Sequence, residues 1–262
     1  MGDKSRFKPY VDSWPKPSEV VAQPNMDLKY VSMWKSEHWE KAHRDWHAFL
    51  TSLWDGSMNP GLEWTVKEMV GDMPISLADI KYAVAIAGTR YVASAGRTRL
   101  LMAPIYDMAN HARTCKNYLS QYDKSDFLHL YAGEDLEAGD EICYAYGALR
   151  DDYAAAIYGF LPALEDPPRL AYVDHWQYKY DQRYSVKFTE EPFDGTPEQV
   201  QVEIARLQAI QDKLRATPDS VPKPKHKDYV YDMLKELERR RLNALEYEIK
   251  RLRNKLGGKT EL

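Results

Sequence analysis

One stretch of the chain constrains the fold most: LLMAPIYDMANHARTCKN, residues 100–117, in which an apolar run ends in polar side chains. The Leu, Met, Ile and Tyr residues that open it are typical of a buried strand. A solvent-exposed turn is rich in Gly, Pro, Asn or Asp and needs no such run before it. We therefore interpret Asp107, Asn110 and His111 as polar groups that a core strand delivers to one place.

Composition indicates a globular chain with room for a sizeable core. Of the 262 residues 44% are hydrophobic and 29% are charged, which is enough for one large domain or two ordinary ones. No apolar run approaches the roughly 18 residues of a membrane span, so no transmembrane segment is expected. The net charge of −4 argues against a nucleic-acid partner.

Charge is unevenly distributed, because residues 222–262 carry 12 Lys or Arg against 7 Asp or Glu. This basic end is either a docking element or the solvated face of a helix. Its last predicted helix, residues 227–256, has an apolar seam with alternating spacings of three and four, as in a short coiled coil. About two heptads are marginal alone, so the seam must meet something in this chain or in another. The seam residues are Leu242, Leu245, Ile249, Leu252 and Leu256.

The cysteines and histidines predict no metal site. Cys115 and Cys143 are too far apart for a CxxC motif, and no Cys/His cluster accompanies them. His43 and His47 are four residues apart, but the segment reads HRDWH where the zinc-protease pattern needs HExxH. Two cysteines without a disulfide framework favour an intracellular, reducing compartment.

Several other elements follow from local signals. Helices are predicted at residues 36–54 and 76–91, the second with Ser76 and Asp79 as a capping box. That second helix is apolar almost all round, which predicts burial. Thr196 begins another helix, with Pro197 in its first turn. Strands are predicted at residues 99–105, 127–131 and 141–146, followed by a helical turn at 152–157.

Residues 1–27 contain four prolines and little periodicity. They predict an extended arm, which is either held by something or a disordered tail. Together with residues 227–256, this arm is the segment expected to contact protein partners.

The order of the motifs is more specific than any one of them. It runs from Thr89-Arg90 through a strand to DMANH at 107–111, then GDEI at 139–142, Tyr146-Gly147 and Gly159-Phe160. This order resembles the C-terminal half of a SET domain, most closely that of the Rubisco and related non-histone protein-lysine methyltransferases. The resemblance covers roughly residues 36–162.

The resemblance implies a role for particular residues. Tyr146 would be the catalytic tyrosine, and Tyr158 would lie near the channel for the target lysine. Arg90 would face the carboxylate of S-adenosylmethionine, and Phe160 would lie near its adenine ring. The implied cofactor-binding residues are Arg90, Asp107, Asn110, His111 and Phe160.

These residue types suit methyl transfer to lysine. The reaction needs a neutral amine aligned with a sulfonium, so positioning does most of the work. Lysine has an ordinary pKa near 10.4, and an apolar aromatic channel would help it lose its proton. Aromatic faces also favour the cationic sulfonium.

The expected fold class is α+β, with a partial SET-like β core at residues 98–162. A helical insert-like region, residues 28–97, would precede it, and a helical extension, residues 163–262, would follow. The glycine-rich opening strands of a SET domain are not found before DMANH. Two local departures accompany this: Asp152 stands where the family usually has Asn, and Thr89 where it often has Ser.

Two functions remain open at this point. The leading hypothesis is a degenerate SET-like protein, a non-catalytic structural subunit of a larger assembly, with no cofactor. The alternative is an S-adenosylmethionine-dependent protein-lysine N-methyltransferase. Family analogy points to a chloroplast or mitochondrion.

Overall fold

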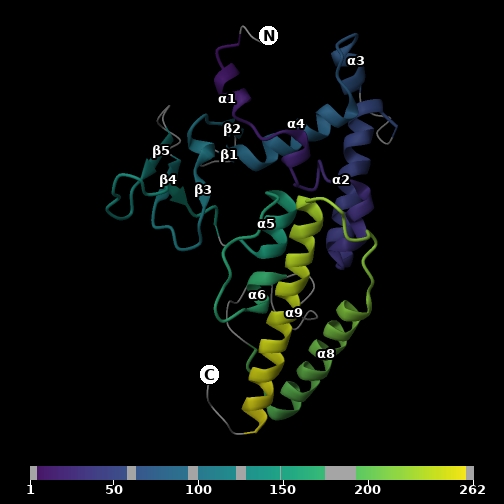
Figure 1. The fold of residues 1–262 in the computed structure, drawn as a ribbon, viewed down its shortest axis with the longest axis vertical. Coiled ribbons are helices and arrows are strands. Elements are labelled where there is room, and N and C mark those ends of the chain that lie inside the picture. Colours follow the sequence, from purple (N-terminus) through teal and green to yellow (C-terminus); the bar gives the residue numbers. More distant parts are fainter. Residues whose placement is uncertain are drawn as a thin grey trace. The chain divides into compact units, whose positions relative to one another are not determined.

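Helices make up most of the chain that the structure describes. The computed structural model describes residues 5–57, 63–93, 100–121, 128–147, 149–174 and 193–257. The four long helices are α2 (Glu37–Asp55), α4 (Leu77–Arg90), α8 (Pro197–Ala216) and α9 (Tyr229–Leu256). Figure 1 shows all four. Each lies where the sequence predicted a helix.

Side-chain caps explain where these helices begin. Ser76 and Asp79 form the predicted capping box of α4, in which each side chain accepts a backbone N–H of the other residue. Thr196 and Gln199 do the same for α8, with Pro197 as the first helical residue. Because these bonds join residues three apart, the signals can be recognised in the sequence alone.

The strands are short and form three separate pairs. β1 (Tyr91–Ala93) pairs antiparallel with β2 (Leu100–Met102), and β4 (Tyr118–Gln121) pairs antiparallel with β5 (Leu128–Tyr131). β3 (Asn110–His111) pairs in parallel with β6 (Cys143–Tyr144). The combination of helices and strands is an α+β arrangement. The predicted strands are present in shortened form as β2, β5 and β6, whereas β1, β3 and β4 were not predicted.

Shorter elements connect these parts. Helix α5 (Asp151–Ile157) lies at the predicted helical turn, and the short helix α6 (Leu170–Val173) follows it. The others are α1 (Lys8–Asp12), α3 (Val66–Val70) and the 3-10 helices η2 (Pro17–Glu19), η3 (Leu28–Trp34) and η4 (Tyr106–Met108).

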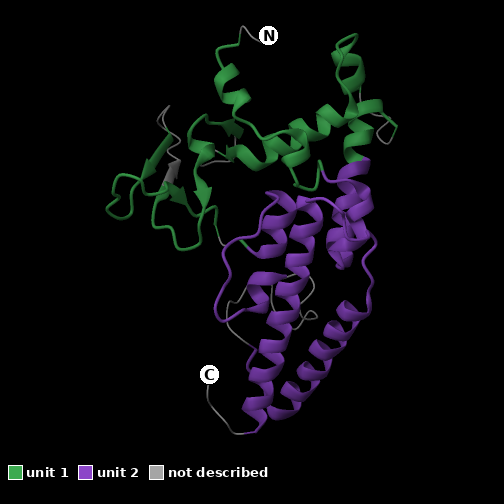
Figure 2. Ribbon diagram, in the orientation of Figure 1, with its two compact units in different colours: residues 1–25, 49–149 green, residues 26–48, 150–262 purple. Residues whose placement is uncertain are grey.

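The chain divides into two compact units, coloured in Figure 2. Unit 1 contains residues 1–25 and 49–149, and unit 2 contains residues 26–48 and 150–262. These boundaries differ from the four expected ranges, since the range 98–162 is divided between both units.

The N-terminal segment is not an extended arm where the structure describes it. It contains α1 and η2, and Val21 and Ala22 are buried. The hydroxyl of Tyr82 on α4 also donates to the carbonyl of Pro15 at 2.8 Å. Prolines stiffen this segment, and packing within unit 1 orders it although its sequence shows little periodicity.

In unit 2, α9 is the central helix. It packs against α8, α6, α5 and η3, and Figure 1 shows α8 running alongside it. Leu245, Ile249 and Leu252 of the predicted seam are buried, whereas Leu256 is partly exposed. The seam therefore meets its own chain, and its apolar face is covered without a partner.

Helix α4 is less buried than its apolar sequence predicted. Only Ala85 and Ile86 of its residues are buried. An apolar helix needs a covering layer, and the strands of unit 1 form three small pairs that leave much of α4 half-exposed.

Candidate functional site

The predicted site residues of unit 1 fall into two groups, and the first is centred on Asp107. Its side chain is completely buried on the turn η4. Its Oδ2 accepts a hydrogen bond from the hydroxyl of Tyr10 and lies 3.5 Å from Nη1 of Arg90, the last residue of α4. Burial, and then the Asp107 carboxylate, raise the pKa of Tyr10. Asp107 thus holds the N-terminal segment and the end of α4 together.

The turn that places Asp107 is strained. Ile105 has φ 77° and ψ −49°, which is close to the γ-turn of positive φ that side-chain-bearing residues rarely adopt. Its side chain is 82% exposed, whereas Asp107, two residues later, points inward. The apolar run therefore delivers its carboxylate through a bend, and not along a straight strand.

The second group lies on the parallel pair of β3 and β6. Asn110 is exposed, and its Nδ2 donates to Oε1 of Glu141 at 2.5 Å. His111 accepts the backbone N–H of Tyr146 at its Nδ1, 3.0 Å away. Burial, and then the charge of Arg113, lower the pKa of His111. The ring is therefore neutral near pH 7.

Tyr146 is anchored to the same strand. Its hydroxyl donates to the carbonyl of Ala109 at 2.6 Å, and its ring centroid lies 5.2 Å from that of His111. The ring centroid of Tyr144 lies 4.6 Å from that of Tyr146, and the ring centroid of Tyr106 lies 5.2 Å from that of Tyr144. Burial raises the pKa of Tyr106 to about 12, so the Tyr106 phenol is protonated at neutral pH.

The remaining two predicted residues belong to unit 2. Tyr158 follows α5, and its ring centroid lies 6.0 Å from that of Phe160. Gly159 between them has φ +74°, which only glycine adopts easily. These two rings contact each other, while Tyr146 and the other predicted residues lie in unit 1.

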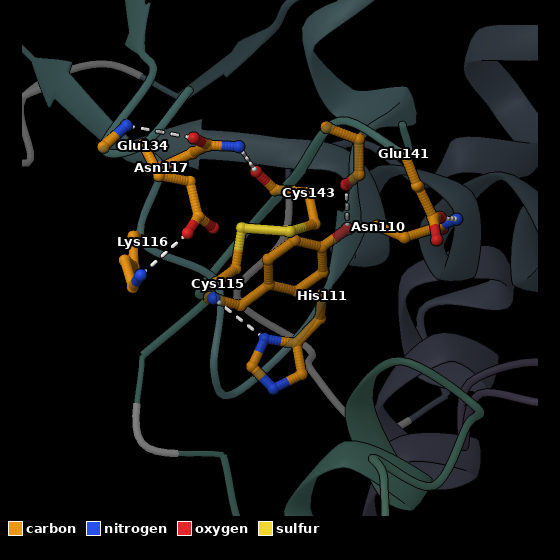
Figure 3. Close-up of a disulfide and its surroundings, with 11 residues drawn as sticks. Asn110, His111, Cys115, Lys116, Asn117, Glu134, Glu141 and Cys143 are labelled. Carbon is orange, nitrogen blue, oxygen red and sulfur yellow. Dashed lines mark hydrogen bonds and ion pairs between the residues drawn. A yellow bond between two sulfur atoms is a disulfide. The ribbon is translucent and has the colours of Figure 1, made fainter. Parts of the chain in front are cut away.

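A disulfide joins Cys115 and Cys143 in unit 1 (Figure 3). The prediction of a reducing compartment treated both residues as free thiols, so that argument no longer holds. Disulfides persist mainly in oxidising environments. Two cysteines that are 28 residues apart give no sequence signal of pairing, because only the fold decides whether they meet.

A buried ionic cluster in unit 2 was not predicted. Arg241 is 1% exposed, and its Nη2 lies 2.5 Å from Oδ2 of the buried Asp174. Asp152 accepts a bond from Trp39 Nε1 at 2.8 Å, and Arg150 Nε lies 3.3 Å from its other oxygen. Burial, and then the Asp174 carboxylate, raise the pKa of Asp152 to about 7.

A second buried pair adjoins that cluster in sequence. Nη1 of Arg240 lies 2.9 Å from Oδ2 of Asp151 and also donates to the carbonyl of Pro162 at 2.8 Å. Some basic residues of α9 are thus internal. The sequence had suggested either a docking element or the solvated face of a helix, and both would leave these residues on the surface. One signal was present: Arg241 follows Leu237 by four residues and precedes Leu245 by four, so it falls on the apolar row of α9.

Both histidines on α2 contact the same backbone carbonyl, that of Met26. Nε2 of His43 lies 3.0 Å and Nε2 of His47 lies 2.6 Å from the carbonyl oxygen of Met26. Trp34 Nε1 donates to Nδ1 of His43 at 3.3 Å. Burial lowers the pKa of His43 to about 4, so the ring is neutral and fastens α2 to the chain before η3. Within the described residues, no group of three or more His, Cys, Asp or Glu is placed to hold a metal ion.

Comparisons with known proteins leave the family open. The sequence matches no family model and no curated protein. In the part of the chain that the structure describes, no helix is long and apolar enough to cross a membrane. The candidate site in unit 1 consists of Arg90, Asp107, Asn110, His111 and Tyr146, whereas Tyr158 and Phe160 belong to unit 2 and are described apart from it.

Proposed function

We propose that the chain is a degenerate SET-like protein that acts as a non-catalytic subunit of a larger protein assembly. The observation that carries this proposal is the contact between Arg90 and Asp107. Under the SET resemblance, Arg90 would meet the carboxylate of S-adenosylmethionine. Its guanidinium instead lies against a buried carboxylate of its own chain, which Tyr10 also contacts.

The energetics favour keeping that contact. The Asp107 side chain is fully buried, and removing the partner of a buried charge typically costs about 3–5 kcal/mol. A ligand carboxylate would have to compete with Asp107 for the same cation. The polar residues of DMANH therefore support the fold, because they join the N-terminal segment, α4 and β3.

The strand pairs of unit 1 supply the surface that a subunit would present. Two-stranded pairs are marginal alone, and their open edges favour pairing with another chain. Their apolar side chains are unusually exposed, which is typical of interaction surfaces. Among the described strand residues, the most exposed of these side chains are Leu100 at 67%, Tyr118 at 56% and Tyr91 at 48%.

This moves the proposed partner surface away from the two segments that the sequence favoured. Residues 5–25 are folded into unit 1, and the seam of α9 is covered by α8. The proposed contacts lie instead on β1–β2 and β4–β5, where unit 1 leaves its apolar side chains exposed.

A lysine N-methyltransferase using S-adenosylmethionine is the second candidate, and one observation favours it. The Tyr146 hydroxyl donates its proton to the Ala109 carbonyl. A hydroxyl used in this way can still accept a hydrogen bond and so orient an amine. Under this alternative, His111 and Asn110 would hold the cofactor beside it.

Calorimetric titration of the full chain with S-adenosylmethionine separates the two functions. The non-catalytic proposal predicts no measurable heat of binding. A micromolar Kd that Arg90→Gln or Asn110→Ala abolishes would overturn it. Arg44→Gln is the matched control, since Arg44 is an exposed arginine on α2.

Cross-linking tests the assembly directly. A tagged full chain, isolated from its source and treated with a lysine-reactive cross-linker, should link to other proteins through Lys116, which is exposed beside β4. A monodisperse monomer that links to no second protein at this position would contradict the proposed role as a subunit.

A further inference from the structure

The disulfide lies at the junction of the two strands that carry the second group of site residues. Cys143 is the first residue of β6 and faces Asn110 in the register of the parallel pair. Cys115 lies four residues after the end of β3. The bond therefore ties β6 to the chain that leaves β3, and it closes a loop that contains the β4–β5 hairpin. Figure 3 shows the bond between these segments.

The backbone pairing between β3 and β6 is short. Only two residue pairs are in register, Asn110 with Cys143 and His111 with Tyr144. Parallel pairing is slightly weaker per residue than antiparallel pairing, and isolated two-stranded units are marginal. A covalent tie beside such a short pair should therefore matter more than one beside a long strand.

One buried side chain, Asn117, adds hydrogen bonds at the junction. Asn117 Nδ2 donates to the Cys143 carbonyl at 3.0 Å, and its Oδ1 accepts the N–H of Gly133 at 3.0 Å. Figure 3 shows Asn117 reaching across to Cys143. Both cysteines are only half-buried, so a small thiol reductant can reach them while Asn117 stays inside.

Two hydrogen bonds at the junction hold Tyr146. The Tyr146 N–H donates to Nδ1 of His111, and its hydroxyl donates to the carbonyl of Ala109. Both bonds join the chain just after β6 to β3 or the residue before it. They can form only while β6 lies beside β3.

We propose that the Cys115–Cys143 disulfide is a reversible redox latch that holds β6 against β3 and thereby fixes Tyr146 on His111. A dithiol reductant opens it: one thiolate attacks a cysteine sulfur, and the S–S bond breaks to give a mixed disulfide. The second thiol then closes the reductant's own disulfide. The products are two protein thiols and one oxidised reductant, a two-electron exchange. This inference does not depend on either proposed function.

Hydrogen exchange on the full chain tests the latch. The protein is compared after equilibration with oxidised or with reduced dithiothreitol, and cysteine alkylation with mass spectrometry reports the thiol state. Reduction should speed exchange at least ten-fold in the peptide that spans residues 141–147, and reoxidation should restore it. Peptides of α8 and α9 should change by less than two-fold, which shows that unit 2 stays folded.

Variants separate the latch from a general loss of structure. Cys115→Ser/Cys143→Ser should exchange fast in residues 141–147 in both buffers, while α9 keeps its protection. Asn117→Ala should keep a response to reductant, because its disulfide remains. Equal exchange of the wild-type chain in the two buffers would refute the latch, and so would two free thiols in protein purified in air without reductant; neither result requires a variant to fold.

Discussion

Replacing Asp152 by asparagine should remove a pH dependence of stability between about pH 4 and pH 7. The folded protein raises the pKa of Asp152 from 3.8 to about 7, mainly through burial and then through Asp174. Because the folded state binds the proton more tightly than the unfolded state, this group favours folding fully below its unfolded pKa. That contribution is lost as the pH rises through about 7.

The magnitude follows from the two pKa values. At 1.36 kcal/mol for each pH unit, the change from 3.8 to about 7 corresponds to a loss on the order of 4 kcal/mol across the window. The structure shows which groups set the pKa of Asp152. Asp174 and burial disfavour the charge, whereas Arg150, Trp39 and Arg241 favour it.

Urea unfolding at four pH values from 4.5 to 7.5, followed by tryptophan fluorescence, measures this effect. Asparagine has the shape of the neutral acid but does not titrate, so Asp152→Asn should lack this slope. Relative to the wild type it should gain about 1.4 kcal/mol for each pH unit across the window and become the more stable protein by pH 7.5. Histidines titrate in both proteins, and comparing the two slopes removes their contribution.

The neighbouring aspartate provides the control. Asp151 is paired with Arg240 at 2.9 Å, so Asp151→Asn should destabilise at every pH tested, by about 1.5–3 kcal/mol, because it removes one of the two carboxylates that contact this buried cation while Glu236 remains. Parallel stability curves for the wild type and Asp152→Asn would refute the reasoning, since they would mean that Asp152 has the same pKa in both states.

Three further changes test other contacts. Gly133→Ala would place a Cβ 2.0 Å from the carbonyl oxygen of Lys116, so the free energy of unfolding in urea should fall by at least about 2 kcal/mol. Gly88→Ala is the control: its Cβ would meet no heavy atom within 4 Å, so the same free energy should rise by about 0.5–1 kcal/mol. Equal effects of the two substitutions would contradict the close approach at Gly133. Ile105→Gly relieves a strained backbone and should raise stability by about 1 kcal/mol in the same assay; a loss would show that the bend is not strained. Arg241→Gln removes the buried cation beside the Asp174 carboxylate and should cost about 3–5 kcal/mol by thermal circular dichroism; an unchanged Tm would show that this ion pair does not stabilise the fold.

Local signals in the sequence were sufficient to predict the long helices. The capping boxes at Ser76 and Thr196 join residues three apart, so they act whatever the rest of the chain does. The apolar spacing of α9 likewise indicated a buried seam, and Leu245 and Leu252 lie in it. The prediction of a buried strand before Asp107 was wrong, because Leu100 is 67% and Ile105 is 82% exposed, although the Asp107 side chain itself is buried.

The partners of the polar residues could not be predicted in this way. Whether Arg90 meets a ligand or Asp107, and whether Cys115 meets Cys143, depends on segments that approach only after folding. Burial decides the protonation of Asp152, and that burial depends on segments distant in the sequence, among them Trp39 and Asp174.

The DMANH stretch shows both sides of this division. Its residue types and its apolar approach are sequence properties, and they indicated polar groups at the end of an apolar run, although that run is exposed in the structure. Only the tertiary structure decided that Asp107 would hold Tyr10 and Arg90, and that His111 would receive the Tyr146 backbone. The reason is physical: caps and periodicity act over a few residues, whereas ion pairs, disulfides and pKa shifts depend on which distant groups share the same buried space.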